Sequence, residues 1–225
     1  MSKINTALTT FRGPNYFVPN MKYAADVNDQ GACRLEFGAP VAANPVGILN
    51  AQSIAVAGVA ATFAITYSES AMSRYGRNIT AVASGVSTSV LTVSGFDYLG
   101  QRVTENITLN GATTVSSLKT FFAITSIAWT ATAATTVNIG WGNSLGIPYR
   151  ASVPLIVAER VDNVAPTAGT VVAGALRNVP QTLITADPRG TYTPNAAVLP
   201  NGVRVYDLTI QVDVDALHGS AHFAA

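Results

Sequence analysis

Few residues in this chain have the chemistry that catalysis or metal binding requires. His218 and His222 are its two histidines, and they lie four positions apart near the C-terminus. On a helix this spacing points both imidazoles the same way, as a Zn²⁺ or Ni²⁺ site needs. The three residues between the histidines are Gly, Ser and Ala, and chain ends usually fray. We therefore expect no metal at this pair.

Two aspartates and one cysteine are the other candidates. Asp213 and Asp215 lie two apart on a predicted strand, so their carboxylates could share a Ca²⁺ ion if carbonyl oxygens completed the shell. Aspartate on the solvent side of a strand also serves solubility, and we favour that interpretation. Cys33 has no second cysteine with which to form an internal disulfide, and we interpret it as a small buried side chain.

Known catalytic motifs are missing from the sequence. It has no Gly-x4-Gly-Lys phosphate loop, no Gly-x-Ser-x-Gly elbow and no His-Glu metalloprotease motif. A Ser-His-Asp triad could still converge in space, but it would depend on a histidine close to the chain end. We predict that the protein is not an enzyme and has no catalytic residue, no metal site and no cofactor.

The elements that would position such residues are predicted to be strands. Residues 89–94 and 102–109 alternate between apolar and polar and are joined by a short connection with Gly at each end, which predicts a β-hairpin. Residues 206–215 show the strongest alternation of the chain and predict a long strand with one buried face. One helical turn is expected after Ser68. Further strands are expected at 53–67 (two short runs), 120–130, 136–141, 152–157 and 170–173.

Many short strands separated by turn residues predict an all-β fold. We expect an antiparallel β-sandwich or jelly-roll-like barrel, formed by residues 51–225 as a single domain. Residues 1–50 differ, because glycine and proline are scattered through them with little periodicity. We therefore expect an extended, irregular N-terminal arm over residues 1–50.

The charge content is unusually low. Charged residues make up 11% of the chain and hydrophobic residues 48%, whereas soluble globular proteins carry about 25% charged residues. This deficit predicts that much of the surface contacts protein, although a monomer with a Thr, Ser and Asn surface is the alternative. The net charge of +1, without a basic cluster, argues against nucleic acid as a partner. Neither a secretory signal nor a membrane-spanning stretch is recognised.

Aromatic residues mark the expected interface, because aromatic side chains dominate binding hot spots. Those of the N-terminal arm could lie on a neighbouring subunit or pack on their own domain. Those at the tip of the predicted hairpin could bind a partner or cap the end of their own sandwich. The predicted interface residues are Phe11, Tyr16, Phe17, Tyr23, Phe96 and Tyr98.

The middle of the chain resembles a strand-and-turn pattern of tailed-bacteriophage structural proteins. In those proteins a strand ending in V-x-G-x-D leads through G-x-x-x-x-E-x-I-x-L-N-G to a K-x-F-x-x-I-x-S-I strand. The resemblance covers about a third of the chain, from Arg77 to Arg150. The matching residues here are Val93, Gly95, Asp97, Gly100, Glu105, Ile107, Leu109, Asn110, Gly111, Lys119, Phe121, Ile124, Ser126 and Ile127.

The resemblance implies a structural role in a virion, with no catalytic residue to carry over. The expected function is a capsid decoration or cement protein, made in the host cytoplasm, that binds the major capsid protein and stabilises the shell as a homo-oligomer, with a trimer favoured. A tail, collar or head-to-tail connecting protein is the alternative. A carbohydrate-binding or host-recognition module, in which Trp129 and Trp141 could contribute, is the second alternative.

Overall fold

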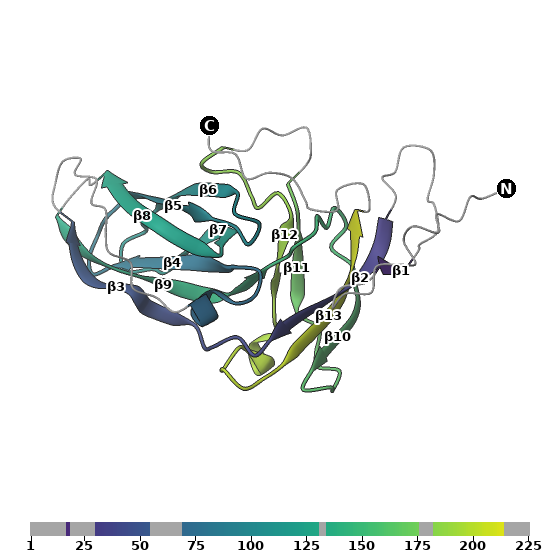
Figure 1. The fold of residues 1–225 in the computed structure, drawn as a ribbon. Coiled ribbons are helices and arrows are strands. Elements are labelled where there is room, and N and C mark those ends of the chain that lie inside the picture. The colour runs from purple at the N-terminus through teal and green to yellow at the C-terminus, as the bar shows by residue number, and fades with distance from the viewer. Residues whose placement is uncertain (1–16, 19–29, 55–68, 131–133, 176–181, 214–225) are drawn as a thin grey trace.

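The computed structural model describes residues 17–18, 30–54, 69–130, 134–175 and 182–213. These residues form thirteen β-strands and two short 3-10 helices, and none of them lies in an α-helix. The predicted all-β fold is confirmed. Figure 1 shows the strands arranged in antiparallel sheets.

The elements follow one another along the chain with short connections. Their bounds are β1 Phe17–Val18, β2 Gln30–Gly38, β3 Asn44–Ile54, η2 Glu69–Met72, β4 Arg77–Ala83, β5 Val90–Phe96, β6 Arg102–Thr108, β7 Val115–Phe121, β8 Ala123–Thr130, β9 Thr135–Gly146, β10 Ile156–Val161, β11 Thr170–Ala173, β12 Gly190–Thr193, η3 Ala196–Val198 and β13 Tyr206–Asp213.

Three sheets are formed by these strands. The first, sheet A, has the order β1-β2-β13-β10. The largest, sheet B, has the order β11-β12-β9-β4-β7, and β3 also pairs with β9. The third, sheet C, has the order β6-β5-β8.

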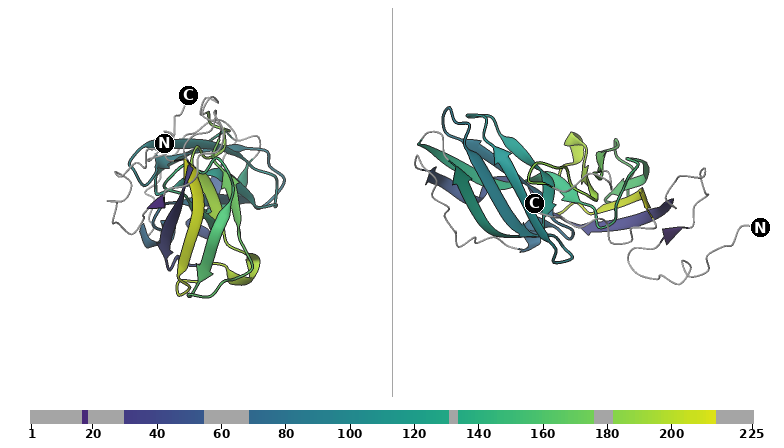
Figure 2. Two further views of the ribbon diagram at one scale, coloured as in Figure 1. Left: turned by 90° about the vertical axis from the view of Figure 1, so that its right-hand side faces the viewer. Right: turned by 90° about the horizontal axis from the view of Figure 1, so that it is seen from above.

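The molecule has two hydrophobic cores. One lies between sheets B and C and is built from β3 to β9, with Ile79, Val93 and Ile127 at its centre. The other is lined by β2, β10, β11, β12 and β13 and contains Leu35 and Leu208. We call residues 44–146 the sandwich half, and β2 together with β10–β13 the terminal half. Figure 2 shows the two halves side by side along the molecule.

Strand β9 contributes side chains to both hydrophobic cores. Its Val137 and Ile139 lie in the core of the sandwich half, whereas Leu145 lies in the second core. The sequence predicted that this strand would end at Trp141, but it continues to Gly146. The pairing of β9 with β4 shifts register here, so that β9 has extra residues between Trp141 and Leu145. Arg77 is fully buried, and its guanidinium donates a hydrogen bond to the carbonyl of Gly142 among these residues. A buried arginine thus stabilises the bulge that links the cores.

Several predicted elements are confirmed. The hairpin is β5 and β6, in register from Val90–Thr108 to Phe96–Arg102. The helical turn is η2, the strand at 170–173 is β11, and the final strand β13 buries alternate residues from Tyr206 to Val212. The predicted strand at 120–130 is wrong in one respect: the chain leaves sheet B after Phe121 and enters sheet C at Ala123.

Residues from Gln30 onward in the expected N-terminal arm form strands of sheets A and B. β2 lies between β1 and β13 in sheet A, and β3 pairs with β9 in sheet B with two register shifts. The side chains of β2 alternate, with Cys33, Leu35 and Phe37 buried in the second core. This 30–37 alternation is a strand signal that glycine and proline on either side obscured. Residues 1–16 and 19–29 of the arm, and residues 55–68 of the predicted strand pair, lie outside the described residues.

Candidate functional site

One face of sheet B is the candidate functional surface in the described structure. In each strand of this sheet, alternate residues enter the two cores, such as Ile79 on β4 and Tyr192 on β12. The residues between them point to the opposite side. They form one continuous face across both halves, composed of Ser116 and Leu118 on β7, Asn78 and Thr80 on β4, Gly142 and Ser144 on β9, Thr191 and Thr193 on β12, and Val172 on β11.

Two adjoining grooves are cut into this open face. One has a volume of about 310 Å³ and lies over β4, β7 and β9, beside Pro45. The other has a volume of about 200 Å³ and extends over β12 and β11. Ser144 lines both grooves, and Leu118 and Val172 expose about half of their side chains along the second. These are shallow, open surfaces, unlike the enclosed pockets that bury most of a small ligand.

The open face carries almost no charge. Asp187 is the one charged residue among those that line the two grooves. Its carboxylate accepts hydrogen bonds from the amide and hydroxyl of Thr120, both at 3.0 Å, and from the amides of Arg189 and Gly190 at 2.9 and 3.2 Å. Asp187 therefore fixes the loop before β12 to the end of β7. The exposed chemistry of the face is left to hydroxyl, amide and aliphatic groups.

A buried ion pair joins the sandwich half to the terminal half. Asp97, at the tip of the β5–β6 hairpin, pairs with Arg189, which precedes β12, and both side chains are 2% exposed. Asp97 also accepts the amides of Leu99 and Gln101, each at 2.8 Å, so the carboxylate shapes the turn as well. Burial of both charges excludes water from the pair, which makes each partner dependent on the other.

A second buried cluster lies at the side of this junction. Glu105 on β6 accepts the amides of Leu118 and Lys119 on β7, at 2.6 and 2.8 Å. Lys119 is fully buried and donates to the carbonyls of Thr104 and Thr182, at 3.0 and 2.7 Å. Burial raises the pKa of Glu105 to about 7, against the opposing effect of the two amides. Burial also lowers the pKa of Lys119. Both groups cross-link strands and the 182–187 loop.

The predicted interface residues have different outcomes. Phe11, Tyr16 and Tyr23 lie outside the described residues. Phe17 lies in β1, where it pairs with Cys33 at the edge of sheet A. The structure therefore leaves the expected interface untested at these four aromatic residues.

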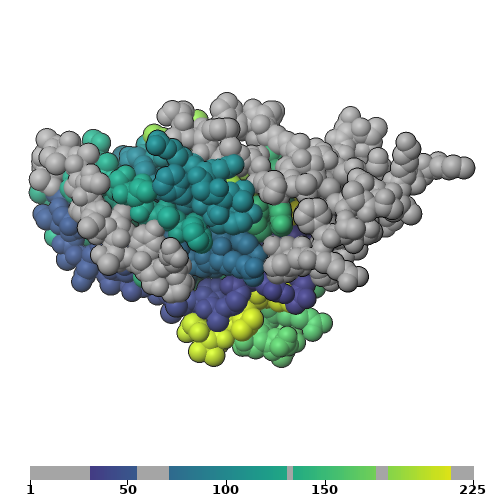
Figure 3. Space-filling view, viewed as in Figure 1, coloured from purple at the N-terminus to yellow at the C-terminus, as the bar shows by residue number. Residues whose placement is uncertain are grey.

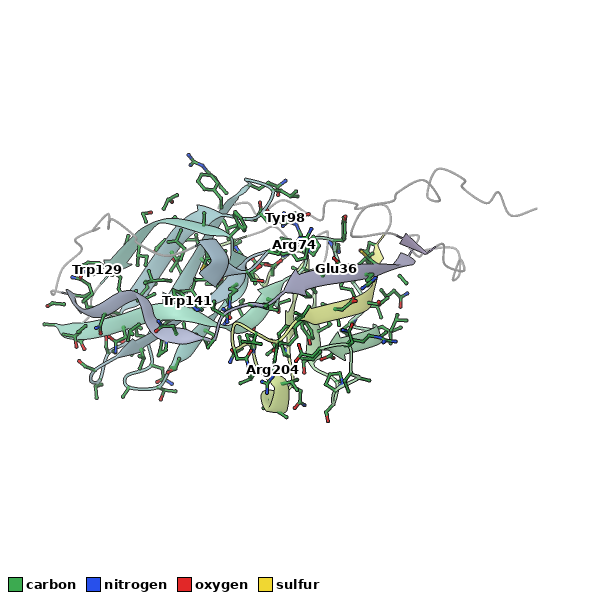
Figure 4. The ribbon with its side chains drawn as sticks, turned by 60° about the horizontal axis from the view of Figure 1, so that its bottom comes forward. Glu36, Arg74, Tyr98, Trp129, Trp141 and Arg204 are labelled. Atoms are coloured by element: carbon green, nitrogen blue, oxygen red, sulfur yellow. The ribbon has the colours of Figure 1, made fainter. Side chains whose placement is uncertain are left out.

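The hairpin-tip aromatics pack within the chain. Phe96 is half-buried, and its carbonyl accepts the amide of Phe122 at 2.8 Å. The ring of Tyr98 meets Tyr75 edge-on with centroids 5.4 Å apart, and the Arg189 guanidinium lies 5.5 Å from the Tyr98 centroid. Figure 4 shows Tyr98 near the junction, with Arg74 and Glu36 beside it. Tyr98 thus anchors the hairpin to the second core.

The residues weighed for metal or catalytic chemistry are occupied by structural contacts or lie outside the described part. Asp213 is fully buried, 3.2 Å from Arg150, and accepts the Ser152 hydroxyl at 2.5 Å, so the expectation of a solvent-facing Asp213 is wrong. The β13 alternation breaks there because Arg150 supplies a buried counter-charge. Asp215, His218 and His222 are outside the described residues.

Two other sequence candidates are also buried. Cys33 is inaccessible, and burial raises the pKa of its thiol to about 12. Trp129 and Trp141 lie in the core of the sandwich half, each 8% exposed; Figure 4 shows them on β8 and β9. Neither indole offers a flat exposed platform for a sugar ring. Among the described residues, no three His, Cys, Asp or Glu side chains gather as a metal site would require.

Comparisons of the chain with protein-family models, curated proteins and solved structures gave no match. In the described part of the chain, no helix has the length and apolar character needed to cross a bilayer. The fold and the open face thus describe an all-β protein in which one sheet face carries almost no charge.

Proposed function

We propose that this protein is a non-enzymatic structural component of a bacteriophage particle, a capsid decoration or cement protein that binds the shell as a homo-oligomer. The observation that carries the proposal is the uncharged open face of sheet B, which spans both halves. Interfaces between proteins are depleted in charge at their centre. Leu118 and Val172 give this face exposed aliphatic groups, and Ser116 gives it an exposed hydroxyl group.

The mechanism of such a protein is association. Many copies bind equivalent sites on one shell, so each contact can be weak while the sum is strong. The buried ion pair between Asp97 and Arg189 supports this role, because it holds the two parts of the open face in one arrangement. A preformed surface loses little conformational freedom on binding. The expected partner is the major capsid protein.

The direct test is co-sedimentation of the purified protein with undecorated capsids. Wild-type protein should sediment with the shells, and Val172→Asp should bind at least tenfold more weakly, because the charge would be desolvated inside the contact. Val86→Asp is the matched control, since Val86 is 95% exposed in the turn before β5, outside both grooves. Equal binding by the two variants would remove the open face from the contact.

A tail, collar or head-to-tail connecting protein remains the second candidate. The same fold and the same uncharged face suit a protein that assembles with its own kind into rings or tubes. Electron microscopy of the concentrated protein separates the two candidates. Rings or tubes, together with no sedimentation with capsids, would replace the decoration role by the connecting role.

A further inference from the structure

Strand β10 has a free edge. It is the last strand of sheet A, and among the described residues it pairs with β13 alone. Its outer edge is closed only at one end, where Val161 and Val164 exchange backbone hydrogen bonds of 2.8 and 3.0 Å. Within the described part of the chain, no strand pairs with the backbone groups between Leu155 and Arg160 on that side. Such an edge is a template for pairing between chains.

The same edge is apolar and exposed. Residues 153–158 read Val-Pro-Leu-Ile-Val-Ala, and no charged residue lies between Arg150 and Glu159. Leu155 is 49% exposed and Val157 57% exposed, because a register shift after Ile156 turns Val157 away from the core. Figure 3 shows the region of β10 and the loop that follows it on the surface, in green. Natural edges are commonly protected by lysine or other charges, and the stretch from Val153 to Ala158 has none.

We propose that β10 is a self-association site, at which the β10 edge of a second copy of this chain pairs antiparallel across a two-fold axis. Sheet A would then continue through the contact as β1-β2-β13-β10 followed by β10-β13-β2-β1 of the second copy. This inference rests on the homo-oligomer of the proposed function and names one of its contacts.

Charge favours a second copy as the occupant. Glu159 is buried, so Arg160 is the exposed charge of β10, and the edge is complementary to itself if the two copies of Arg160 stay apart when they approach. If the axis passes through Val157, each Arg160 lies opposite Pro154 of the other copy. The two guanidinium-bearing positions are then six residues apart along the strands, about 20 Å, which exceeds the screening length of about 8 Å at physiological salt.

The pairing has a consequence for symmetry. A two-fold contact joins subunits in pairs, so by itself it gives a dimer. If a three-fold contact forms elsewhere, as the expected trimer requires, the two contacts together give an even-numbered assembly such as a hexamer. The β10 contact leaves the open face of sheet B free, because β10 belongs to sheet A.

Sedimentation velocity of the full chain tests the proposal, with Val157→Lys as the disrupting variant and Val86→Lys as the matched control. Wild type and Val86→Lys should associate through pairs, and Val157→Lys should raise the dissociation constant of the pair at least 100-fold. Circular dichroism and thermal unfolding should be unchanged for Val157→Lys, because the side chain is already exposed. A wild-type monomer at about 50 μM, or a Val157→Lys variant that still pairs, would overturn the proposal.

Two further measurements identify the occupant. Single cysteines placed at 155 to 160 and oxidised should cross-link between copies with one maximum near Val157, since only the position at the axis meets itself. Cys33 is buried and does not compete. A variant lacking residues 1–16 should still pair; if it is monomeric, the N-terminal segment is the occupant and the β10 pair is wrong. Capsid binding is measured separately, so loss of pairing and loss of the proposed function are distinguishable.

Discussion

Removing the negative charge from the buried pair at the junction should destabilise the whole molecule. In Asp97→Asn the amide oxygen can still accept the Leu99 and Gln101 amides, so the turn is retained and the charge alone is lost. Arg189 would keep neutral neighbours such as the Gln101 side chain at 3.2 Å, in a site where its side chain is 2% exposed. Breaking one partner of a buried pair costs about 3–5 kcal/mol.

Urea unfolding followed by circular dichroism measures this loss. With an m-value of about 2 kcal/mol/M, the midpoint should fall by about 1.5–2.5 M. Asp207→Asn is the matched control, because its pair with Arg34 is half-exposed and should contribute less than about 1 kcal/mol. The double variant Asp97→Asn with Arg189→Met should be more stable than the sum of the single losses predicts, since it leaves no unpaired charge.

Asp97→Asn and Asp207→Asn should lower the free energy of unfolding by different amounts. If the two losses are equal, the buried pair does not hold the halves together. A further readout concerns cooperativity: with the junction weakened, the two cores should unfold in separate transitions, whereas wild type should show one.

Three other perturbations have defined outcomes. Gly140→Ala should cost about 2 kcal/mol or more by thermal or urea unfolding, because the new Cβ would collide with the Asn44 carbonyl, whereas Gly85→Ala has open space around it and should change stability by less than about 1 kcal/mol. Burial raises the folded-state pKa of Glu105 to about 7. The stabilisation by its neutral carboxyl group is therefore complete below pH 4.5 and is lost as the pH rises through 7. Between pH 5 and 8 the free energy of unfolding of the wild type should fall by up to about 3 kcal/mol, and that of Glu105→Gln should not fall in this way. Cys33, buried and with its thiol pKa raised to about 12, should react with a thiol reagent at pH 8 only at the rate of unfolding; fast labelling of the native protein would contradict this.

The fold class was predictable from the sequence because alternation reports burial directly. In β5, β6 and β13 one face is apolar and the other polar, so both the strand and its inner face could be assigned. In β4, β7 and β9 this contrast is weak. Asn78 and Thr80 alternate with Ile79 and Ala81, and Ser and Thr occur on both sides of β7, so the open face left no distinct pattern in the sequence.

The junction could not have been predicted, since its partners are far apart along the chain. Asp97 and Arg189 looked like ordinary turn residues, and nothing around Glu105 and Lys119 in the sequence indicated that their charges are buried. In a chain that is poor in charge, however, an aspartate flanked by aromatics in a tight turn was a usable signal. The structure explains why two positions of the phage-like pattern are glycine. Gly100 has a positive φ, and a side chain at Gly95 would collide with the Ala123 carbonyl.

The order of strands along the chain determines when each half can be completed. The sandwich half is one continuous stretch inserted between β2 and β10, whereas the terminal half draws β2 from one side of that stretch and β10 to β13 from the other. During synthesis at about 5–20 residues per second, β2 emerges roughly 10 to 35 s before its partner β13. The sandwich half can fold in that interval, while the edge of β2 that pairs with β13 has no partner yet. Chain completion, and not local folding, thus limits closure of the terminal half.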